Sequence, residues 1–463
     1  MPNNKIIKPE FSIPIYIKKL LKTAQTKNVE LYIVGGAVRD LFQNKTVQDW
    51  DFATDTVPEK ILLIFPKNSY YNNKYGTVTI NTDKKKIEIT TFRSEKGYKD
   101  KRHPDVVNWG TSLQEDLSRR DFTINAIALK AQPFELSSEK VKFEVIDPYQ
   151  GIKDIQHKLI KAVGNANDRI NEDALRMMRA IRISAQTDFE IDKETLKAIE
   201  NNWELIKNIS WERIRDELFK ILLAPNSKKG IELLYQTKLL GYILPELEKG
   251  RGMDQPKHHV YDVWEHSLRA MQETPSKNPI VKFASLLHDV GKPYVVQGEK
   301  KERTFHNHEV KGAFMVKNIA QRLRLSKKQS EKLFKLVRWH QFTVDEKITD
   351  KAIKRFIKRV GQDNIDDILS LRVGDRLGSG AKETSWRTEL FKKRILAVQK
   401  EPFSLKDLKI SGEDVMKTLQ ISPGPIVGKI LNEIFAKVEE DKKLNSKQEL
   451  IKLIKPAYKK LRS

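Results

Sequence analysis

The spacing of apolar residues changes near Gly151, and this change restricts the folds that the chain can adopt. Before Gly151, residues 31–34, 75–80 and 87–92 form short apolar or β-branched runs, which are typical of strands. After Gly151, apolar residues recur every three or four positions, which is typical of amphipathic helices. We therefore expect an α+β fold, with one small mixed sheet near the N-terminus and helices in the rest of the chain.

The charge balance favours a polyanionic partner. The 463 residues include 86 Lys and Arg against 62 Asp and Glu, which gives a net charge of +24. Such an excess attracts RNA, DNA and nucleoside triphosphates, although solvated lysine-rich faces produce the same balance.

The absence of cysteine limits the chemistry of the chain. Disulfides, thiolate metal sites and cysteine nucleophiles are excluded, so any metal must lie on His, Asp or Glu. The sequence has no run of about 18 apolar residues and no apolar leader, so we expect neither a membrane span nor a secretory signal. These features fit a cytoplasmic protein.

A glycine pair follows the first apolar run. Gly35 and Gly36 come directly after residues 31–34, and Arg39 follows one helical turn later. Glycine lets the backbone approach a ligand closely, helix starts offer free N–H groups, and Arg39 adds a positive charge. The arrangement suits a phosphate group, but the same residues also form ordinary strand-to-helix turns.

Two carboxylates follow at strand spacing. Asp49 and Asp51 would share one face of a strand, where a divalent cation relieves their repulsion. Two-metal phosphoryl transfer needs such a pair and a third carboxylate nearby. Glu88, in a later strand, is our candidate for the third, and Asp121 is the alternative. The pair alone is also compatible with a solvated turn.

Four runs, in one order along the chain, resemble a known family. They read VGGAVRD, DWDFAT, TFRSE and RRDFTINA, and they are similar to the head of the class II tRNA nucleotidyltransferase and bacterial poly(A) polymerase family, in the polymerase β superfamily. The resemblance implies a nucleotidyltransferase head at residues 1–150, a helical neck that binds nucleobase and RNA at 151–250, an HD body at 251–380 and a tRNA-binding helical tail at 381–463.

The resemblance also implies roles for individual residues. Mg²⁺ would lie on Asp49 and Asp51, with Glu88 as the further catalytic carboxylate. The incoming nucleotide would be contacted by Gly35, Gly36, Arg39, Arg119, Arg120, Asn125, Asp173, Arg176, Arg179 and Arg182. Residues 93–105 match the mobile loop of the family.

One segment is expected to choose the nucleotide. Asp173, Arg176 and Arg179 lie at helical spacing and should form one stripe, with Arg182 at its edge, although an exposed salt-bridged helix has the same spacing. Cytosine and adenine present an amino donor beside a ring-nitrogen acceptor, whereas guanine and uracil present the reverse. An Asp acceptor beside an Arg donor therefore fits C and A. The family uses residues like Asp173 and Arg176 as such a protein template.

Histidines gather in one part of the second half. Seven of the nine fall within residues 258–340, which indicates a metal site of imidazoles and carboxylates. This part resembles the HD phosphohydrolase superfamily and implies a divalent transition metal on His266, His288, Asp289 and Asp375. His308 and His340 are further candidates, for a second metal or for phosphate contact. Hydrolysis of RNA-end phosphates, such as 2′,3′-cyclic phosphates, would follow; a helical scaffold with a vestigial site is the alternative.

These expectations describe a template-independent nucleotidyltransferase. It would add CMP, CMP and AMP from CTP and ATP to the 3′ end of tRNA by two-metal transfer, and it would bind no membrane. The alternatives are an enzyme that adds only CC or only A, a poly(A) polymerase, and an inactive RNA-binding protein. Residues 75–93 lack a Gly-Arg-Arg-Phe-like run, which favours tRNA over poly(A).

The tail offers one further motif. Gly424 and Gly428 surround a predicted helix start, where N–H groups suit an RNA phosphate or belong to a plain loop. The sequence predicts no oligomeric state.

Overall fold

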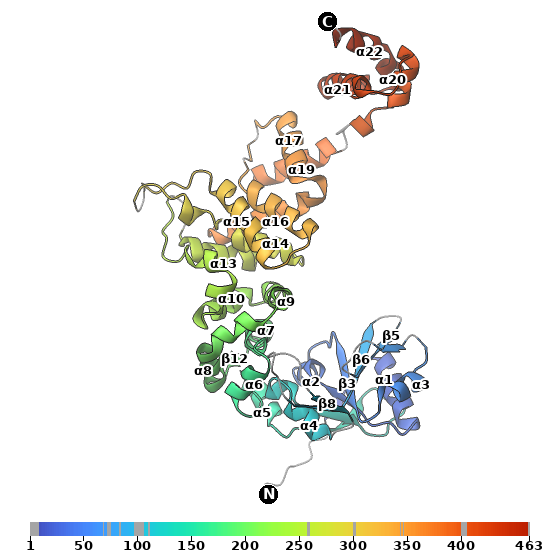
Figure 1. Ribbon diagram of the computed structural model, residues 1–463, viewed down its shortest axis with the longest axis vertical. Helices are drawn as coiled ribbons and strands as arrows, with labels where there is room; N and C mark the ends of the chain where they lie inside the picture. The colour runs from blue at the N-terminus through green and yellow to red at the C-terminus, as the bar shows by residue number, and fades with distance from the viewer. Residues whose placement is uncertain are drawn as a thin grey trace.

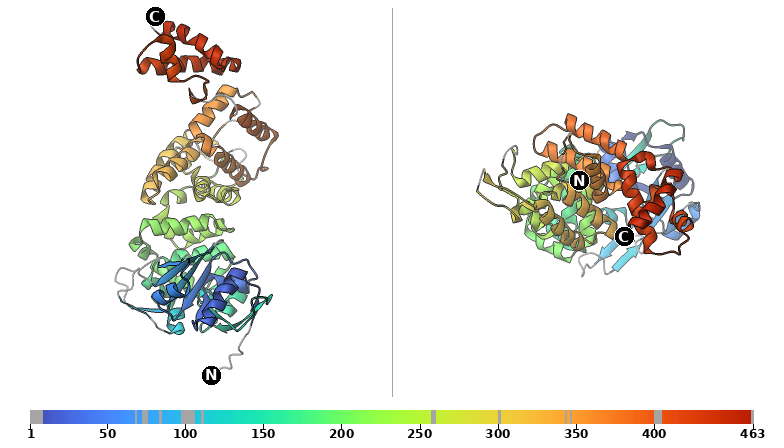
Figure 2. Two further views of the ribbon diagram at one scale, coloured as in Figure 1. Left: turned by 90° about the vertical axis from the view of Figure 1, so that its right-hand side faces the viewer. Right: turned by 90° about the horizontal axis from the view of Figure 1, so that it is seen from above.

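The computed structural model of the chain describes residues 9–67, 69–71, 76–82, 85–96, 106–109, 112–256, 260–299, 302–342, 344–345, 347–399 and 405–461. The molecule is elongated, with the N-terminal sheet at one end and the last three helices at the other (Figure 1). The helices between these ends succeed one another along the long axis (Figure 2).

The head contains an eight-stranded mixed sheet with the order β1-β10-β9-β2-β3-β6-β5-β4. The strands are β1 (Glu10–Phe11), β2 (Leu31–Val34), β3 (Trp50–Thr54), β4 (Ser69–Tyr71), β5 (Thr77–Asn81), β6 (Lys86–Thr91), β9 (Ala128–Ala131) and β10 (Val141–Ile146). β3 and β6 run parallel, whereas the other neighbours are antiparallel. The strands predicted from the sequence are confirmed, and fully buried β2 lies beside β3 in the middle of the sheet.

Short helices and two small sheets complete the head and begin the neck. The head helices are α1 (Ile15–Thr26), α2 (Gly36–Phe42), α3 (Pro58–Ile64), α4 (Leu113–Ser118) and α5 (Gly151–Gln156), with the 3₁₀ turn η1 (Thr123–Asn125). β7 (Arg93–Lys96) pairs with β8 (Val106–Trp109), and β11 (Leu159–Ile160) pairs with β12 (Glu190–Ile191). Residues 97–105 of the predicted mobile loop lie outside the described residues.

The rest of the described chain is helical, which confirms the predicted α+β class. The neck holds α6 (Ala166–Glu172), α7 (Arg176–Thr187), α8 (Lys193–Asn202), α9 (Trp211–Leu222), α10 (Ser227–Gln236), α11 (Leu239–Ile243) and α12 (Pro245–Glu248). The body holds α13 (Val263–Glu273), α14 (Pro279–Leu287), α15 (His308–Arg322), α16 (Lys327–Trp339), α17 (Asp350–Val360) and α18 (Ile365–Gly378). One hydrophobic core runs from Ile13 in the head to Val398 beyond the body.

The C-terminal part divides into two. α19 (Trp386–Gln399) belongs to the main core, because the Phe391 ring lies 5.5 Å from that of Phe342 and 5.6 Å from that of Phe356. α20 (Gly412–Leu419), α21 (Pro425–Glu440) and α22 (Lys447–Lys460) pack around a separate core. No helix in the described part of the chain has the length and apolar character that crossing a bilayer demands. The predicted domain boundaries stay predictions.

Candidate active site in the head and candidate metal centre in the body

The turn after β2 leaves space because it begins with glycine. Gly35 has φ +70°, a conformation that favours glycine, and α2 begins at the next residue. A Cβ atom at Gly35 would lie 3.4 Å from Oδ2 of Asp51 and 3.5 Å from Nη1 of Arg120. The bare backbone therefore brings a turn, a carboxylate and a guanidinium group together, as a phosphate site with a metal requires.

Pairing between β3 and β6 gathers the acidic residues. Asp51 and Glu88 are direct partners in this parallel pair, and Asp49 lies just before β3 at an exposed position. The pKa of Asp51 is raised by burial and then by the negative charge of Glu88, with a smaller contribution from Asp49. The carboxylates therefore crowd negative charge near the starts of the central strands β3 and β6, and hard oxygen ligands of this kind suit Mg²⁺.

Asp121, the alternative third carboxylate, is engaged elsewhere. It is buried, accepts a hydrogen bond from Nδ2 of Asn125 at 3.0 Å, and accepts another from Nε of Arg179 at 2.8 Å. Burial would raise the pKa of Asp121, but the guanidinium of Arg179 and the Asn125 hydrogen bond hold it well below its ordinary value. Of the two candidates, Glu88 is thus the one that lies beside Asp51.

The Asp121–Arg179 pair joins head to neck, and its loss should be measurable. At pH 7 we expect Asp121→Asn to cost about 2 kcal/mol of stability, because the partly exposed Arg179 loses its buried partner. The pKa of Asp121 is lower in the folded chain than in the unfolded one, so this contribution is complete above about pH 4 and declines as the pH falls further. Chemical unfolding of both proteins should show a deficit that shrinks below pH 4, and a constant deficit would contradict the pairing.

The arginines expected at the triphosphate are held by Asp116, which sequence reasoning missed, and by Asn125, which it predicted. Asp116, at 1% exposure, pairs with Arg119 and lies 3.1 Å from Nη2 of Arg120. Burial would raise the pKa of Asp116, but the guanidinium groups of Arg120 and Arg119 keep it below its ordinary value. Nη1 of Arg39 donates to Oδ1 of Asn125 at 3.2 Å. The spacing of three and four residues from Asp116 to the two arginines was the available signal.

The segment expected to choose the nucleotide is not one helix, which corrects the predicted stripe. α6 ends at Glu172, Asp173 has extended backbone, and α7 begins at Arg176. Oδ1 of Asp173 accepts a hydrogen bond from the backbone N–H of Leu175 at 3.1 Å. Asp side chains favour this kind of local bond over a continuous helix, and the break follows from it.

Each arginine of the segment has a partner of its own. Nη1 of Arg176 donates to Oε2 of Glu172 at 2.6 Å, and its Nη2 donates to the carbonyl oxygen of Arg119 at 2.8 Å. Nε of Arg182 lies 2.7 Å from Oε2 of Glu217, on α9. The segment therefore places Arg176 next to the head, whereas Arg182 contacts another neck helix.

In the body, four imidazoles surround one carboxylate. Nε2 of His266 and His288 lie 3.4 and 3.2 Å from Oδ2 of Asp289, whereas Nε2 of His308 and His340 lie 3.2 and 3.7 Å from its Oδ1. Two sets of three potential ligands therefore share Asp289, and all five residues are buried.

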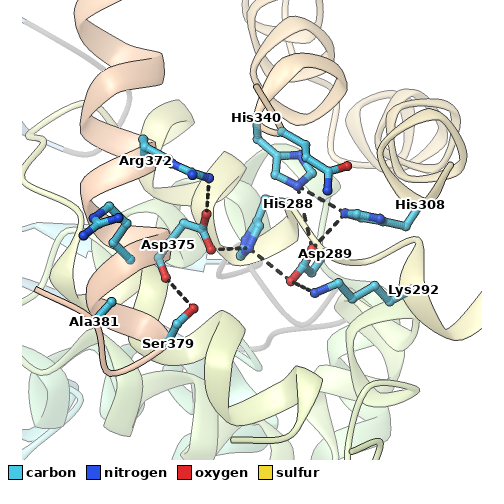
Figure 3. A pocket seen from close by; sticks show the side chains of 11 residues that line it. His288, Asp289, Lys292, His308, His340, Arg372, Asp375, Ser379 and Ala381 are labelled. Atoms are coloured by element: carbon cyan, nitrogen blue, oxygen red, sulfur yellow. Dashed lines mark hydrogen bonds and ion pairs between the residues drawn. The ribbon is translucent and has the colours of Figure 1, made fainter. Parts of the chain in front are cut away.

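Asp375 completes the first set. Its Oδ1 lies 3.3 Å from Nε2 of His266 and 3.6 Å from Nε2 of His288. The predicted ligands thus come together from α13, α18 and the end of α14, and the two further candidates from the start of α15 and the end of α16. Figure 3 shows the five of them that line the pocket, which are His288, Asp289, Asp375, His308 and His340.

Backbone carbonyl groups fix the orientation of three of these imidazoles. Nδ1 of His288, His308 and His340 lies 2.7, 2.8 and 2.7 Å from the carbonyl oxygen of the residue three positions earlier. Each Nδ1–H therefore donates to the backbone and leaves Nε2 as the lone-pair nitrogen that faces Asp289. This is the arrangement expected of metal-ligating histidines.

Positive side chains line the same pocket. Nζ of Lys292 lies 2.6 Å from Oδ2 of Asp289, and Nη1 of Arg372 lies 3.2 Å from Oδ2 of Asp375 (Figure 3). Burial lowers the pKa of His340 to about 3, so that imidazole stays neutral at pH 7. Sequence reasoning missed both cations, although Lys292 lies only one turn after the doublet.

The structure adds little to two further predicted features. His258 and His259 of the histidine cluster lie outside the described residues. Gly424 and Gly428 have open space where a Cβ would stand, and α21 begins directly after Gly424. Both glycines remain candidates for phosphate contact.

Three family models match the chain in succession. They are the poly A polymerase head domain at residues 31–161, the probable RNA and SrmB-binding site of polymerase A at residues 188–250, and the HD domain at residues 257–377.

Two relatives and one solved structure that match nearly the whole chain are all named CCA-adding enzymes. A CCA-adding enzyme of Pediococcus pentosaceus is 30% identical over 94% of this chain and 96% of its own, and one of Ligilactobacillus salivarius is 32% identical over 95% and 96%. The crystal structure of the Bacillus stearothermophilus CCA-adding enzyme in complex with CTP is similar over 97% of this chain and 99% of its own, with 25% identity and a TM-score of 0.70.

Proposed function

The chain belongs to the family of CCA-adding enzymes, and we propose that it adds C, C and A to the 3′ end of tRNA from CTP and ATP, without a nucleic-acid template. The observation that carries this function is the register of β3 and β6, which sets Asp51 beside Glu88 at the Gly35 turn. Paired carboxylates, a bare backbone turn and a guanidinium group are the parts that nucleotidyl transfer from a triphosphate needs.

The carboxylates are proposed to hold Mg²⁺. Asp49, Asp51 and Glu88 supply hard oxygen ligands, and the pKa of Asp51 is raised first by burial and then by the negative charge of Glu88, which a cation would neutralise. When bound there, Mg²⁺ supplies charge neutralisation at the reacting phosphate.

The residues around these carboxylates are proposed to position the substrates. Arg39, Arg119 and Arg120 are proposed to hold the triphosphate, with Asp116 and Asn125 fixing their guanidinium groups. The 3′-hydroxyl of the tRNA then releases its proton to water as its oxygen bonds to the α-phosphorus of CTP or ATP, the bond from that phosphorus to the bridging oxygen breaks, and pyrophosphate leaves with that electron pair.

Nucleotide choice is proposed to reside in Asp173 and Arg176. Asp173 would accept a hydrogen bond from the amino group of C or A, and Arg176 would donate to the ring nitrogen beside it. G and U would leave both side chains facing a group of the wrong kind, which is strongly unfavourable in a site shielded from water.

Replacing Asp173 should relax this choice. With Asp173→Ala, we expect the preference for CTP over UTP, measured as the ratio of kcat/KM values, to fall by about 100-fold. Asp192→Ala is the matched control, because it removes a helix cap from α8 and leaves the nucleotide site alone. A variant at Asp173 that still rejects UTP and GTP as the parent does would contradict the assignment.

The body is proposed to be a divalent-metal phosphohydrolase. The two ligand sets that share Asp289 favour this function over a vestigial site, and Lys292 and Arg372 offer positive charge for a phosphate in the same pocket. His266, His288, Asp289 and Asp375 would hold one transition metal, and His308 and His340 with Asp289 a second. Such an ion polarises a phosphate for attack by water. RNA ends that carry a 2′,3′-cyclic phosphate are the proposed substrate.

The basic helical remainder is proposed to bind tRNA mainly through phosphates, so binding should weaken steeply with salt. Residues 151–250 and 381–463 are assigned this role, as neck and tail. We also propose a cytoplasmic location, since a chain without cysteine suits a reducing compartment.

Sequencing of reaction products tests the function. The protein is incubated with tRNA that lacks its 3′ end, with CTP, ATP or both. The proposed function predicts CC from CTP alone and CCA from both nucleotides. Four other results would each support one alternative. A CC end with both nucleotides indicates an enzyme that adds only CC, and a single A added only to a CC end indicates one that adds only A. A poly(A) run indicates a poly(A) polymerase, and an unchanged end indicates an inactive RNA-binding protein.

A further inference from the structure

We propose that Arg213, in neck helix α9, is a positioning residue that sets nucleotide choice by holding the carboxylate of Asp173. Nη2 of Arg213 lies 2.9 Å from Oδ2 of Asp173, although the two residues are 40 positions apart. Both side chains are partly buried, at 24% and 21% exposure. The proposal rests on the proposed role of Asp173 in reading the base.

The acceptor needs support because its backbone provides little. Asp173 lies in extended backbone between α6 and α7, where one local bond, from the N–H of Leu175 to Oδ1, limits rotation of the side chain. Among the described residues, Arg213 is the one side chain that is hydrogen-bonded to this carboxylate. Without it, Oδ2 is free to turn toward water.

The contact with Arg213 leaves the acceptor usable. A carboxylate oxygen offers two lone-pair sites, so Oδ2 can accept from Arg213 and from the amino group of a base together. Selection between C and U depends on an acceptor at a fixed place, since a rotating carboxylate can swing away from the uracil carbonyl and escape the repulsion. The orientation that Arg213 imposes is therefore what makes the wrong base unfavourable.

Arg176, the donor of the pair, is supported differently. Its Nη1 donates to Glu172 and to the carbonyl oxygen of Arg169 at 2.9 Å, and Glu172 is itself paired with Arg169. These contacts lie within one short segment, and the further bond to the Arg119 carbonyl comes from the head. The acceptor thus depends on one distant side chain, whereas the donor is held by several nearby groups.

Arg213→Gln tests the proposal, with Arg322→Gln as the matched control. Arg322, in body helix α15, forms an ion pair with Glu246 of the neck at 25% and 19% exposure, so both changes remove a similarly buried ion pair, but only one of them touches Asp173. We measure kcat/KM for CTP, UTP, ATP and GTP on the full chain, together with the thermal unfolding midpoint. Arg213→Gln should lower the CTP/UTP and ATP/GTP ratios by about 10-fold to 100-fold, and Arg322→Gln should leave both ratios unchanged.

A partial rescue separates positioning from simple stability. Arg213→Lys keeps the charge but loses the planar guanidinium, so its ratios should fall between those of the parent and Arg213→Gln. If Arg213→Gln does not fold, Arg213→Lys tests the proposal by itself. CTP/UTP and ATP/GTP ratios equal to those of the parent in Arg213→Lys would then overturn the proposal. Equal losses of all four kcat/KM values, with unchanged ratios, would overturn it as well.

The same assay distinguishes this proposal from the base-reading function on which it rests. If Asp173→Ala relaxes selection and Arg213→Gln does not, the role of Arg213 fails and the role of Asp173 stands. If neither variant relaxes selection, the assignment of base reading to Asp173 fails.

Discussion

Asp51→Asn is expected to lower the rate of CMP addition by about 1,000-fold or more, because Asn keeps the shape of the side chain but not the charge that holds Mg²⁺. Asp51 is the strand partner of Glu88 and comes two positions after exposed Asp49. Glu88→Gln should therefore cost less than Asp51→Asn. Single-turnover addition to tRNA that lacks its 3′ end is the measurement.

Asp55→Asn is the matched control for this change. Asp55 follows the other end of β3 and is exposed, and its carboxylate accepts hydrogen bonds from the hydroxyl groups of Thr54 and Thr56. It should keep the parent rate, and tRNA binding should be unchanged in both variants. If Asp51→Asn retained more than about a tenth of the parent rate, the carboxylate would hold no ion essential for transfer.

Asp289→Ala should remove essentially all of the divalent metal that the purified chain carries. Both ligand sets share this carboxylate, and its loss would leave His266, His288 and Asp375 in one set and two imidazoles in the other. His340→Ala should remove one of two ions, because it belongs to one set only. Elemental analysis per chain after gel filtration measures both effects.

His306→Ala is the control for the metal measurement. His306 is exposed and lies two positions before His308, so its loss leaves both ligand sets intact. Full metal content in Asp289→Ala, or none in the parent protein, would contradict the proposed metal centre. Equal loss in His340→Ala and Asp289→Ala would indicate one ion in place of two.

The sequence alone could predict features that are local in the chain. The two predicted strands at 75–80 and 87–92 form the β5–β6 hairpin, because β-branched runs flank a polar turn. The glycine turn and the His288–Asp289 doublet were also visible, since their residues are neighbours in sequence. The order of the four motifs along the chain indicated the family. The change in the spacing of apolar residues indicated the α+β class.

Contacts between distant segments could not be predicted in the same way. The meeting of Asp51 with Glu88 depends on parallel pairing of β3 with β6, which the alternation of residues does not specify. The helical spacing of Asp173 and Arg176 suggested one helix. The helix is interrupted there because the carboxylate of Asp173 accepts a hydrogen bond from the backbone N–H of Leu175. The role of Arg213 could not be predicted because its partner Asp173 lies 40 positions earlier in the chain, between α6 and α7.

One chain of contacts links the two halves of the proposed nucleotide site. Arg39 donates to Asn125, Asn125 donates to Asp121, and Asp121 accepts from Arg179 on α7. The residue expected at the triphosphate is thus joined to α7, whose first residue, Arg176, is proposed to read the base.

A structure of the chain with CTP and Mg²⁺ tests the central claim most directly. We expect the triphosphate at the Gly35 turn, an ion between it and the carboxylates of Asp51 and Asp49, and the cytosine amino group within hydrogen-bond distance of Asp173. A nucleotide bound elsewhere, with Asp51 facing solvent and no ion beside it, would contradict the account and leave a basic helical RNA-binding protein in its place.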